Sequence, residues 1–302
     1  MKRIALLVIT ILCFSCSEEE KPFEEDSGPV DTDFFSDKEV EVYFENDSNS
    51  GINVVFLGDG YLKKDLGKEF GNYRRDAREM LDELFNTHPF SEYIDFFNVY
   101  IVYAESLETG EDLGHIMANN ITTAFQINRT SNDISYDFEK AFDFATSALP
   151  VNNDDVNLIL MATNYGMNGL ATGMIAFVER MKIRTMKHEV GHAFGQLGDE
   201  YNNNFTNPEI YPNLDSTNDI GVIEWSHFIG LENYENVGAF ERTQGWVPES
   251  FSLMGNNEIG NSFNAPSREA IVKKIMELRG LDYNFSDFLE IDEISLEKIN
   301  SQ

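Results

Sequence analysis

The residues best suited to chemistry lie in the segment HEVGH, residues 188–192. Positions i and i+4 of an α-helix lie about 40° apart on one face, so His188 and His192 can offer two imidazole nitrogens to one metal ion. Zinc sites in hydrolases use such neutral ligands and leave one position open for water and substrate. Glu189 lies beside them, where it can take the proton of the attacking water. The spacing therefore predicts a Zn²⁺ site with Glu189 as general base.

A third ligand has to come from outside this pair of histidines. Residues 181–187 contain no Gly or Pro, so a helix can run into the motif. Gly195 then offers a break, because glycine enters left-handed conformations at low cost. A chain that turns there can bring Asp199 or Glu200 back to the metal, and a carboxylate suits zinc in either case. Both acidic residues are therefore candidates.

A methionine follows further along the chain, in the segment FSLMG, residues 251–255. This segment could form a tight turn that carries Met254 beneath the metal site. A methionine considered alone more often fills a gap in a hydrophobic core. The isolated histidines His88, His115 and His227 have no neighbour at a ligand spacing, and structural roles are expected for them.

Several segments of the sequence resemble the M64 peptidases, a family named for a secreted bacterial IgA peptidase. The segment HEVGHAFGQLGDEY, residues 188–201, is similar to the active-site signature of that family. The segment NVVFLGDGY, residues 53–61, resembles its opening strand and turn. Further similar stretches lie at residues 89–100, 155–166 and 263–266. The resemblance implies a zincin, or metzincin-like, catalytic domain with a zinc cofactor and proteolytic activity.

The resemblance also implies roles for individual residues. The zinc ligands of the family fall on the two histidines of the motif, and its catalytic glutamate falls on Glu189. In the broader metzincin pattern the third ligand stands ten residues after the first histidine, where this sequence has Gly198. Asp199 is then the first candidate, with Glu200 as the alternative. The residue that does not bind the metal could orient a ligand histidine.

The N-terminus predicts export. Lys2 and Arg3 precede an apolar run at residues 4–14, which is too short to span a bilayer and suits a signal peptide. The run ends just before Cys16, and this arrangement resembles a bacterial lipoprotein signal in which that cysteine is lipidated. We therefore expect a lipoprotein signal peptide at residues 1–15 and an exported, outer-membrane lipoprotein. The alternative is an ordinary secretory signal followed by an incidental cysteine.

An acidic segment follows the signal. Residues 16–38 are rich in Glu, Asp and Ser and are predicted to form a flexible tether. The segment is similar to surface-export tags of Bacteroidetes-type lipoproteins, so surface display is a hypothesis. The only two cysteines of the chain are Cys13 and Cys16, which both belong to the signal. The catalytic domain, expected at residues 39–302, must therefore be stable without disulfides.

The net charge of the chain indicates which classes of binding partner it can have. The chain has 22 Lys and Arg against 53 Asp and Glu, which gives a formal net charge of −31. Nucleic acid is a poor partner for such a chain, because its phosphates must be neutralised by cations. The expected partners are a protein or peptide substrate and, through the lipid anchor, a membrane. No obligate protein partner is evident.

The hydrophobic periodicity predicts an α/β (α+β) domain with a mixed, twisted sheet and packed helices. Strands are expected at residues 39–45, 53–57, 97–103, 156–162 and 174–178, and helices at residues 62–86, 136–148 and 267–279, besides the HEVGH helix. Residues 201–250 show little regular pattern and are predicted to form a loop-rich lower subdomain. We expect the HEVGH helix beneath an edge strand that pairs with an extended substrate.

These observations predict a secreted, lipid-anchored zinc endopeptidase that hydrolyses extracellular proteins. Two alternatives remain open. One is a surface binding or adhesion lipoprotein on a zincin scaffold, whose metal is structural or lost. The other is a zinc amidase that acts on cell-wall peptides. No residue of the sequence points to an immunoglobulin hinge as the substrate.

Overall fold

The residues described by the computed structural model are 31–110, 122–129, 134–201, 207–243, 245–255 and 260–300, without the side chains of the last three. The contacts along the chain define one unit at Asp31–Gln302 and another at Met1–Val30. The expected signal peptide and Cys16 therefore lie outside the described residues. Within those residues, no helix is both long enough and apolar enough to cross a membrane.

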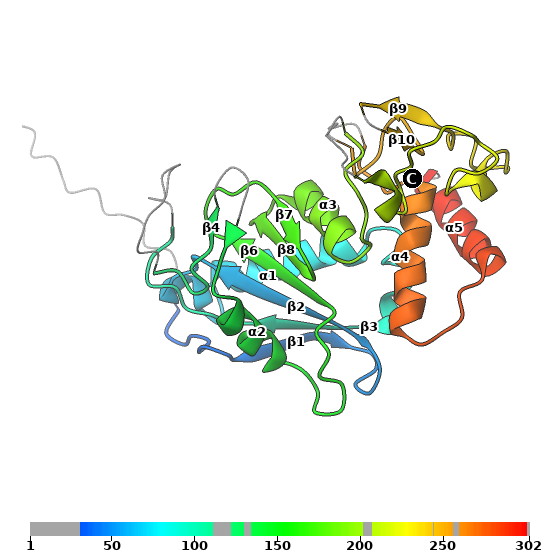
Figure 1. Cartoon of the computed structure of the whole chain (residues 1–302). Coiled ribbons are helices and arrows are strands. Elements are labelled where there is room, and N and C mark those ends of the chain that lie inside the picture. Colours follow the sequence, from blue (N-terminus) through cyan, green and yellow to red (C-terminus); the bar gives the residue numbers. More distant parts are fainter. Residues whose placement is uncertain are drawn as a thin grey trace, which may run out of the picture. The chain divides into compact units, whose positions relative to one another are not determined.

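A six-stranded sheet forms the centre of the unit that begins at Asp31 (Figure 1). Its strands lie in the order β1-β3-β2-β6-β8-β7. Their bounds are β1 Val40–Glu45, β2 Ile52–Asp59, β3 Phe97–Val102, β6 Leu158–Thr163, β7 Leu170–Thr172 and β8 Ile175–Glu179. The four inner strands run parallel, whereas β1 and β7 are antiparallel to their neighbours at the two edges. The sheet is thus mixed, as the sequence predicts.

Helices cover both faces of the sheet. The helices α1 Asn72–Phe85 and α3 Ile183–Ala193 lie on one face, and α2 Phe138–Thr146 lies on the other (Figure 1). All eight residues of β2 are buried, and their side chains alternate between the two layers. Strands covered on both faces have to be apolar along their whole length, which explains the sequence of the inner strands.

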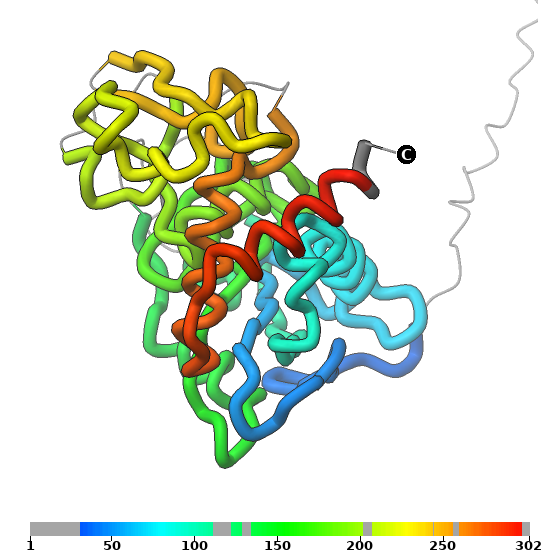
Figure 2. Tube along the Cα trace, turned by 90° about the vertical axis from the view of Figure 1, so that its right-hand side faces the viewer, coloured from blue at the N-terminus to red at the C-terminus, as the bar shows by residue number. Residues whose placement is uncertain are grey.

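The chain after α3 has little regular structure, as predicted. It contains short 3₁₀ turns, a hairpin of β9 Phe240–Arg242 with β10 Gly245–Val247, and the buried side chain of Trp225. Two helices follow, α4 Ala265–Leu278 and α5 Phe285–Asn300 (Figure 2). Helix α5 is not among the predicted elements. A second small hairpin, β4 Asn128–Arg129 with β5 Ile134–Ser135, lies outside the main sheet.

The folded unit starts earlier than the sequence predicts. Residues 31–38 are predicted as part of the flexible tether, but they pack against the sheet domain. Asp31 accepts a hydrogen bond from the backbone amide of Glu69 at 2.8 Å. Phe35 stacks on Tyr103, with ring centroids 3.7 Å apart. The acidic and polar residues that suit a solvated tether also accept hydrogen bonds from backbone amides, so composition could not separate the two roles.

A buried cluster of charges joins α5 to the rest of the unit. The carboxylate of Asp292 accepts hydrogen bonds from Nε and Nη2 of Arg268 at 2.7 Å each. The same carboxylate lies 2.6 Å from Nε2 of His88. Burial opposes ionisation, but the hydrogen bonds from Arg268 and His88 hold the pKa of Asp292 below its ordinary value. Burial also disfavours the charged form of His88 and so lowers its pKa. The hydrogen bonds to Asp292 and Glu92 outweigh burial, and the pKa of His88 is raised overall. His88 is therefore part of a structural ion cluster.

Replacing Asp292 with Asn should destabilise the protein by about 3 to 5 kcal/mol, because Arg268 and His88 would stay buried without their counter-charge. The lowered pKa of Asp292 means that its contribution is present above the unfolded pKa of about 3.9. It declines as the pH falls below that value and is fully lost once the pH has fallen through the lower, folded value. Urea unfolding should show a difference between wild type and variant that shrinks on acidification.

The matched control is Asp287→Asn, on the exposed side of the same helix, which should leave the unfolding free energy nearly unchanged. A difference for Asp292→Asn that stays constant down to pH 3 would show that its ionised form carries no special stabilisation.

Candidate active site

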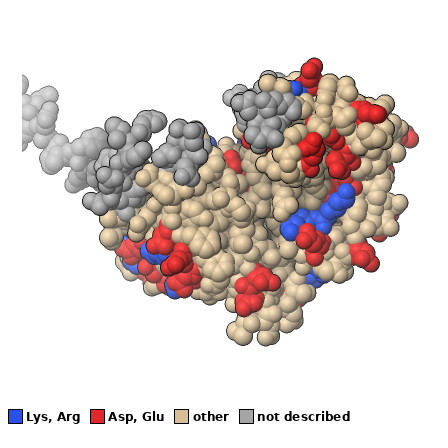
Figure 3. Space-filling model, in the orientation of Figure 1, with Lys and Arg blue, Asp and Glu red and all other residues tan. Residues whose placement is uncertain are grey.

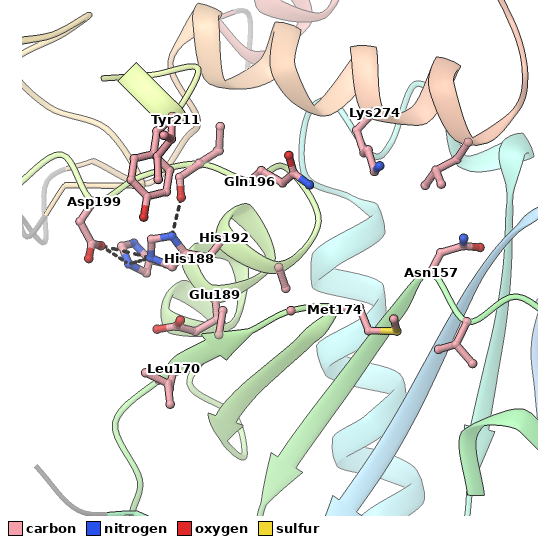
Figure 4. A pocket seen from close by; sticks show the side chains of 18 of the residues that line it. Asn157, Leu170, Met174, His188, Glu189, His192, Gln196, Asp199, Tyr211 and Lys274 are labelled. Atoms are coloured by element: carbon pink, nitrogen blue, oxygen red, sulfur yellow. Dashed lines mark hydrogen bonds and ion pairs between the residues drawn. The ribbon is translucent and has the colours of Figure 1, made fainter. Parts of the chain in front are cut away.

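An open cleft of about 740 Å³ lies beside α3. Its lining comes from β7 and the following turn, from α3, from the segment 196–201, and from Tyr211 and α4 (Figure 4). The HEVGH motif lies at one end of this cleft. Because β7 is the last strand of the sheet, it offers its outer edge to this space.

Three ligand-type atoms converge at that end of the cleft. Nε2 of His188 and Nε2 of His192 are 3.1 Å apart. Oδ1 of Asp199 lies 3.0 Å from the first nitrogen and 3.2 Å from the second. Among the described residues, this is the group of His, Cys, Asp and Glu side chains whose atoms could hold one metal ion.

The protonation of the two histidine rings fits a cation at this point. Nδ1 of His188 lies 3.0 Å from the carbonyl oxygen of Leu253, and Nδ1 of His192 lies 2.6 Å from that of Leu197. A carbonyl oxygen only accepts, so each Nδ1 must carry the proton. Both Nε2 atoms then present lone pairs to each other and to a carboxylate. Ligand histidines in metal sites typically donate their other ring N–H to such a partner.

The close approach of His188, His192 and Asp199 changes the pKa values of His192 and Asp199. Burial works against the charge of Asp199, but when protons rather than a cation lie between these atoms, hydrogen bonds from His188 and His192 hold the pKa of its carboxyl well below the usual range. Burial also disfavours protonation of His192, yet the neighbouring carboxylate of Asp199 raises the pKa of that histidine overall. The group therefore holds an ionised carboxylate beside two nitrogen donors.

Asp199 and Glu200 point in opposite directions, which separates the two candidates for the third ligand. Asp199 faces the histidines, whereas Glu200 is buried away from the cleft. The Glu200 carboxylate accepts hydrogen bonds from Nδ2 of Asn213 at 2.8 Å, from Nδ2 of Asn264 at 2.7 Å and from the hydroxyl of Ser252. Burial raises the pKa of Glu200 to about 7 despite these hydrogen bonds. Glu200 thus ties together three segments that follow α3.

Glu189 lies on the cleft side of α3, against the backbone that leads into β7. A Cβ atom at Gly169 would lie 2.2 Å from Oε1 of Glu189 and 2.4 Å from Cγ2 of Thr185. The absence of a side chain at Gly169 therefore lets the edge strand approach the carboxylate. Sequence reasoning missed Gly169, because a close backbone approach leaves no sign in residue spacing.

The break after α3 differs from the predicted one. The sequence predicts a left-handed turn at Gly195, but the residue with positive φ is Gln196, at 54°. Gly195 is needed for space instead, because a Cβ there would lie 2.9 Å from Cγ1 of Ile271. Gln196 is exposed and lines the cleft. A left-handed non-glycine residue is uncommon and often marks a functional region.

Met254 lies directly beneath α3, fully buried. A Cβ atom at Gly191 would approach its Sδ to 2.6 Å, so the glycine of the motif provides the contact surface. The turn that carries Met254 is held by Arg184, which donates to the carbonyl oxygens of Gly255 at 2.8 Å and Leu253 at 3.3 Å. Arg184 therefore links α3 to the same carbonyl that orients His188. Its role could not be read from the sequence.

Other aromatic and histidine side chains have distinct positions. Tyr201 stacks on His188, with ring centroids 6.3 Å apart. Tyr211, which the sequence does not single out, points towards the end of the cleft where His188, His192 and Asp199 converge (Figure 4). His227 lies 3.0 Å from Glu269, away from the cleft lining. His115 lies outside the described residues.

The fold and this group of side chains define an α/β protein with a His₂–Asp group that could hold a metal ion. The family model described as IgA Peptidase M64 matches residues 40–217, a span that includes the sheet, α3 and Asp199. The match covers more than half of the chain, which therefore belongs to this family. Membership supports a peptidase. A comparison with curated proteins gives no match.

Replacing Glu200 with Ala should lower stability by about 3 kcal/mol or more, because several buried donors would lose their acceptor at once. The change should also weaken metal binding about 10- to 100-fold, since Asp199 is the next residue. Glu200→Gln is the matched control, because it keeps one oxygen acceptor and the volume. Unfolding and competition with a chelator would measure both effects. Metal affinity equal to that of wild type in Glu200→Ala would contradict this positioning role.

Replacing Gly169 with Ala should lower turnover while leaving the metal content unchanged, because the new methyl group would displace the Glu189 carboxylate. We expect a loss of about 10²-fold, within the range that a displaced general base costs. Gly166→Ala is the control, since a Cβ there meets no atom within 4 Å. Equal turnover of the two variants would show that Gly169 does not set the position of Glu189.

Proposed function

We propose that this protein is an exported, lipid-anchored zinc endopeptidase that hydrolyses extracellular proteins in the cleft beside β7. The observation that carries the proposal is the convergence of two imidazole nitrogens and the Asp199 carboxylate at one end of an open cleft. Membership in the M64 peptidase family supports the same class of reaction. The zincin character of the fold, with α3 beneath the edge strand β7, is part of the proposal.

Zinc is the metal that this donor set fits best in our proposal. Two neutral imidazoles and one carboxylate form a ligand set used by catalytic zinc sites, which keep a further position open. His188, His192 and Asp199 would hold the ion. When bound, it would supply Lewis acidity that polarises the scissile carbonyl and favours ionisation of water. The carbonyl oxygens of Leu253 and Leu197 keep the two rings in the orientation that this binding needs.

Glu189 is the general base and acid of the proposed reaction. Its carboxylate takes a proton from the water that attacks the scissile carbonyl. It then passes this proton to the nitrogen of the leaving amine, so the peptide bond breaks without a free amide anion. The close packing of Gly169 against Oε1 limits the positions that the carboxylate can occupy. Such restriction favours a fixed geometry for proton transfer.

The edge strand β7 would hold the substrate in place. It pairs with β8 on one side, and its residues Leu170 and Ala171 line the cleft on the other. An extended peptide can add to such an edge through main-chain hydrogen bonds, which are independent of sequence. Side chains of the substrate would then alternate between the cleft and solvent.

Export and lipidation belong to the same proposal. They are supported by the apolar run before Cys16 and by the acidic segment that follows it. Mass spectrometry of the protein purified from a bacterial membrane fraction would test both, by detecting an acylated N-terminal Cys16. A mature protein that begins elsewhere would remove the anchor from the proposal without affecting the peptidase.

Replacing Glu189 with Gln should keep metal binding but lower peptide hydrolysis by about 10²- to 10⁴-fold, because the proton acceptor is lost. The zinc-loaded proteins would be incubated with a mixture of mucosal and serum proteins, and new N-termini would be sequenced by mass spectrometry. Glu139→Gln, on the exposed face of α2, is the control and should cleave like wild type. Treatment of wild type with a chelator should abolish the cleavages, and added Zn²⁺ should restore them.

Turnover by Glu189→Gln comparable to that of wild type would contradict the assignment of the base. Identical, empty cleavage profiles for all variants would favour the surface-binding alternative. Activity against cell-wall peptides alone would favour the amidase.

A further inference from the structure

The end of the cleft away from the metal-binding group has its own chemistry. Among the described residues that line the cleft, Lys274 of α4 is the only Lys or Arg. Asn157, just before β6, and Gln196 line the same end, and Figure 4 shows Lys274 reaching into the space between them. Apolar surface from Met174, which is 37% exposed, lies nearby. The proposed catalytic chemistry uses none of these side chains.

Lys274 is available to an incoming anion. Its side chain is 26% exposed, and its ammonium group lies 3.0 Å from Glu277, one turn further along α4. The Glu277 side chain is 70% exposed, so this ion pair is a surface pair that contributes little free energy. A carboxylate that enters the cleft can replace Glu277 as the partner of the Lys274 ammonium group.

Asn157 adds a directed hydrogen-bond donor. Its Oδ1 accepts a hydrogen bond from the backbone amide of Asn53 at 2.7 Å. Since that partner is a donor, the oxygen must face Asn53 and the amide NH₂ faces the other way. The half-buried side chain thus presents its NH₂ group on the cleft side.

Gln196 supplies a second amide at the same place. It keeps a left-handed backbone conformation, with φ at 54°, although it is not glycine. The exposed side chain projects from the turn after α3 into the cleft. A carboxylate has two oxygens and up to four acceptor positions, which matches one ammonium group and two amide NH₂ groups.

We propose that Lys274, Asn157 and Gln196 form a carboxylate-binding subsite, through which the enzyme selects peptides with an acidic group at this end of the cleft. The group is the side chain of Asp or Glu, or the C-terminal carboxylate of a peptide. This inference rests on the proposed peptidase function and names its substrate class.

The subsite favours acidic peptides, whereas the overall negative charge of the protein favours basic ones. A net charge of −31 attracts basic segments at long range. That attraction is screened beyond about 8 to 10 Å at physiological salt, whereas a contact inside the cleft is screened much less. Over the face shown in Figure 3, Lys and Arg side chains gather over α4, next to acidic neighbours. Selection at the cleft should therefore follow the local cation.

The test compares peptide pairs that differ only by Glu or Gln at each position around the scissile bond, and pairs that end in a free acid or an amide. Wild type should show about tenfold higher kcat/KM for the acidic member at one position, the scale of a charge-assisted hydrogen bond. Lys274→Met should abolish this preference, and Lys274→Glu should reverse it in favour of Lys. A preference confined to free-acid peptides would identify the C-terminal carboxylate as the ligand.

Lys273→Met is the matched control. Lys273 is the preceding residue of α4, is 49% exposed and pairs with Glu269. It does not line the cleft, but it lines a neighbouring hollow together with Lys274 and Gln196. This variant should keep the preference for Glu. No preference in wild type, or the same preference in wild type and Lys274→Met, would overturn the inference while the peptidase function stands.

A binding experiment separates this inference from failure of the proposed function. Zinc-loaded Glu189→Gln protein would be used to select peptides from a random display library. Enrichment of Asp and Glu that disappears when the same protein also carries the substitution Lys274→Met supports the subsite, even where wild type cleaves nothing. Selection without acidic enrichment, or without any binder, contradicts it.

Discussion

The structure is organised around three lone-pair-bearing atoms that face one another within about 3 Å. Nε2 of His188, Nε2 of His192 and Oδ1 of Asp199 repel one another unless a proton or a cation lies between them. The fold therefore has to hold these groups in place by other contacts. Most of the interactions described around α3 serve this purpose, and they come from segments far apart in the sequence.

Two parts of the chain fix the group, the turn directly after α3 and the turn at Leu253 and Met254. The His192 ring is oriented by the carbonyl of Leu197, a few residues along the same turn. The His188 ring depends on the carbonyl of Leu253, which Arg184 of α3 also contacts. Asp199 is followed by Glu200, whose backbone amide donates to the carbonyl of Met254 at 2.9 Å. The loop-rich region after α3 is thereby fastened to the helix it serves.

The sequence predicts the parts of the site that depend on helix geometry. Two histidines four residues apart must share one face, so their pairing and the position of Glu189 follow directly. The choice between Asp199 and Glu200 does not follow from helix geometry. Neighbouring residues of an extended segment point to opposite sides, and spacing cannot say which side faces the two histidines. Gly169 and Arg184 escape notice because their roles depend on contacts with residues that are distant in the sequence.

In the sheet too, elements with a strong local pattern are predicted from the sequence, whereas elements that depend on distant contacts are missed. The inner strands are identified because strands covered on both faces are apolar throughout. The edge strand β7 is overlooked within a glycine-rich stretch, although it borders the cleft. Its three residues carry too little periodic signal for recognition. Helix α5 is missed as well, since its packing depends on the buried charge of Asp292 rather than on an apolar face alone.

Two glycines explain how the cleft keeps its dimensions. Gly169 brings the edge strand against Glu189 from one side of α3, and Gly191 brings Met254 against the helix from the other. Neither position has room for a methyl group, so α3 is confined between β7 and the turn beneath it. A shift of either neighbour would move the helix that carries both histidines. The position of the edge strand beside the cleft and that of the three ligand-type atoms are therefore set by the same helix, and the alignment between them does not depend on the exposed side chains of the cleft.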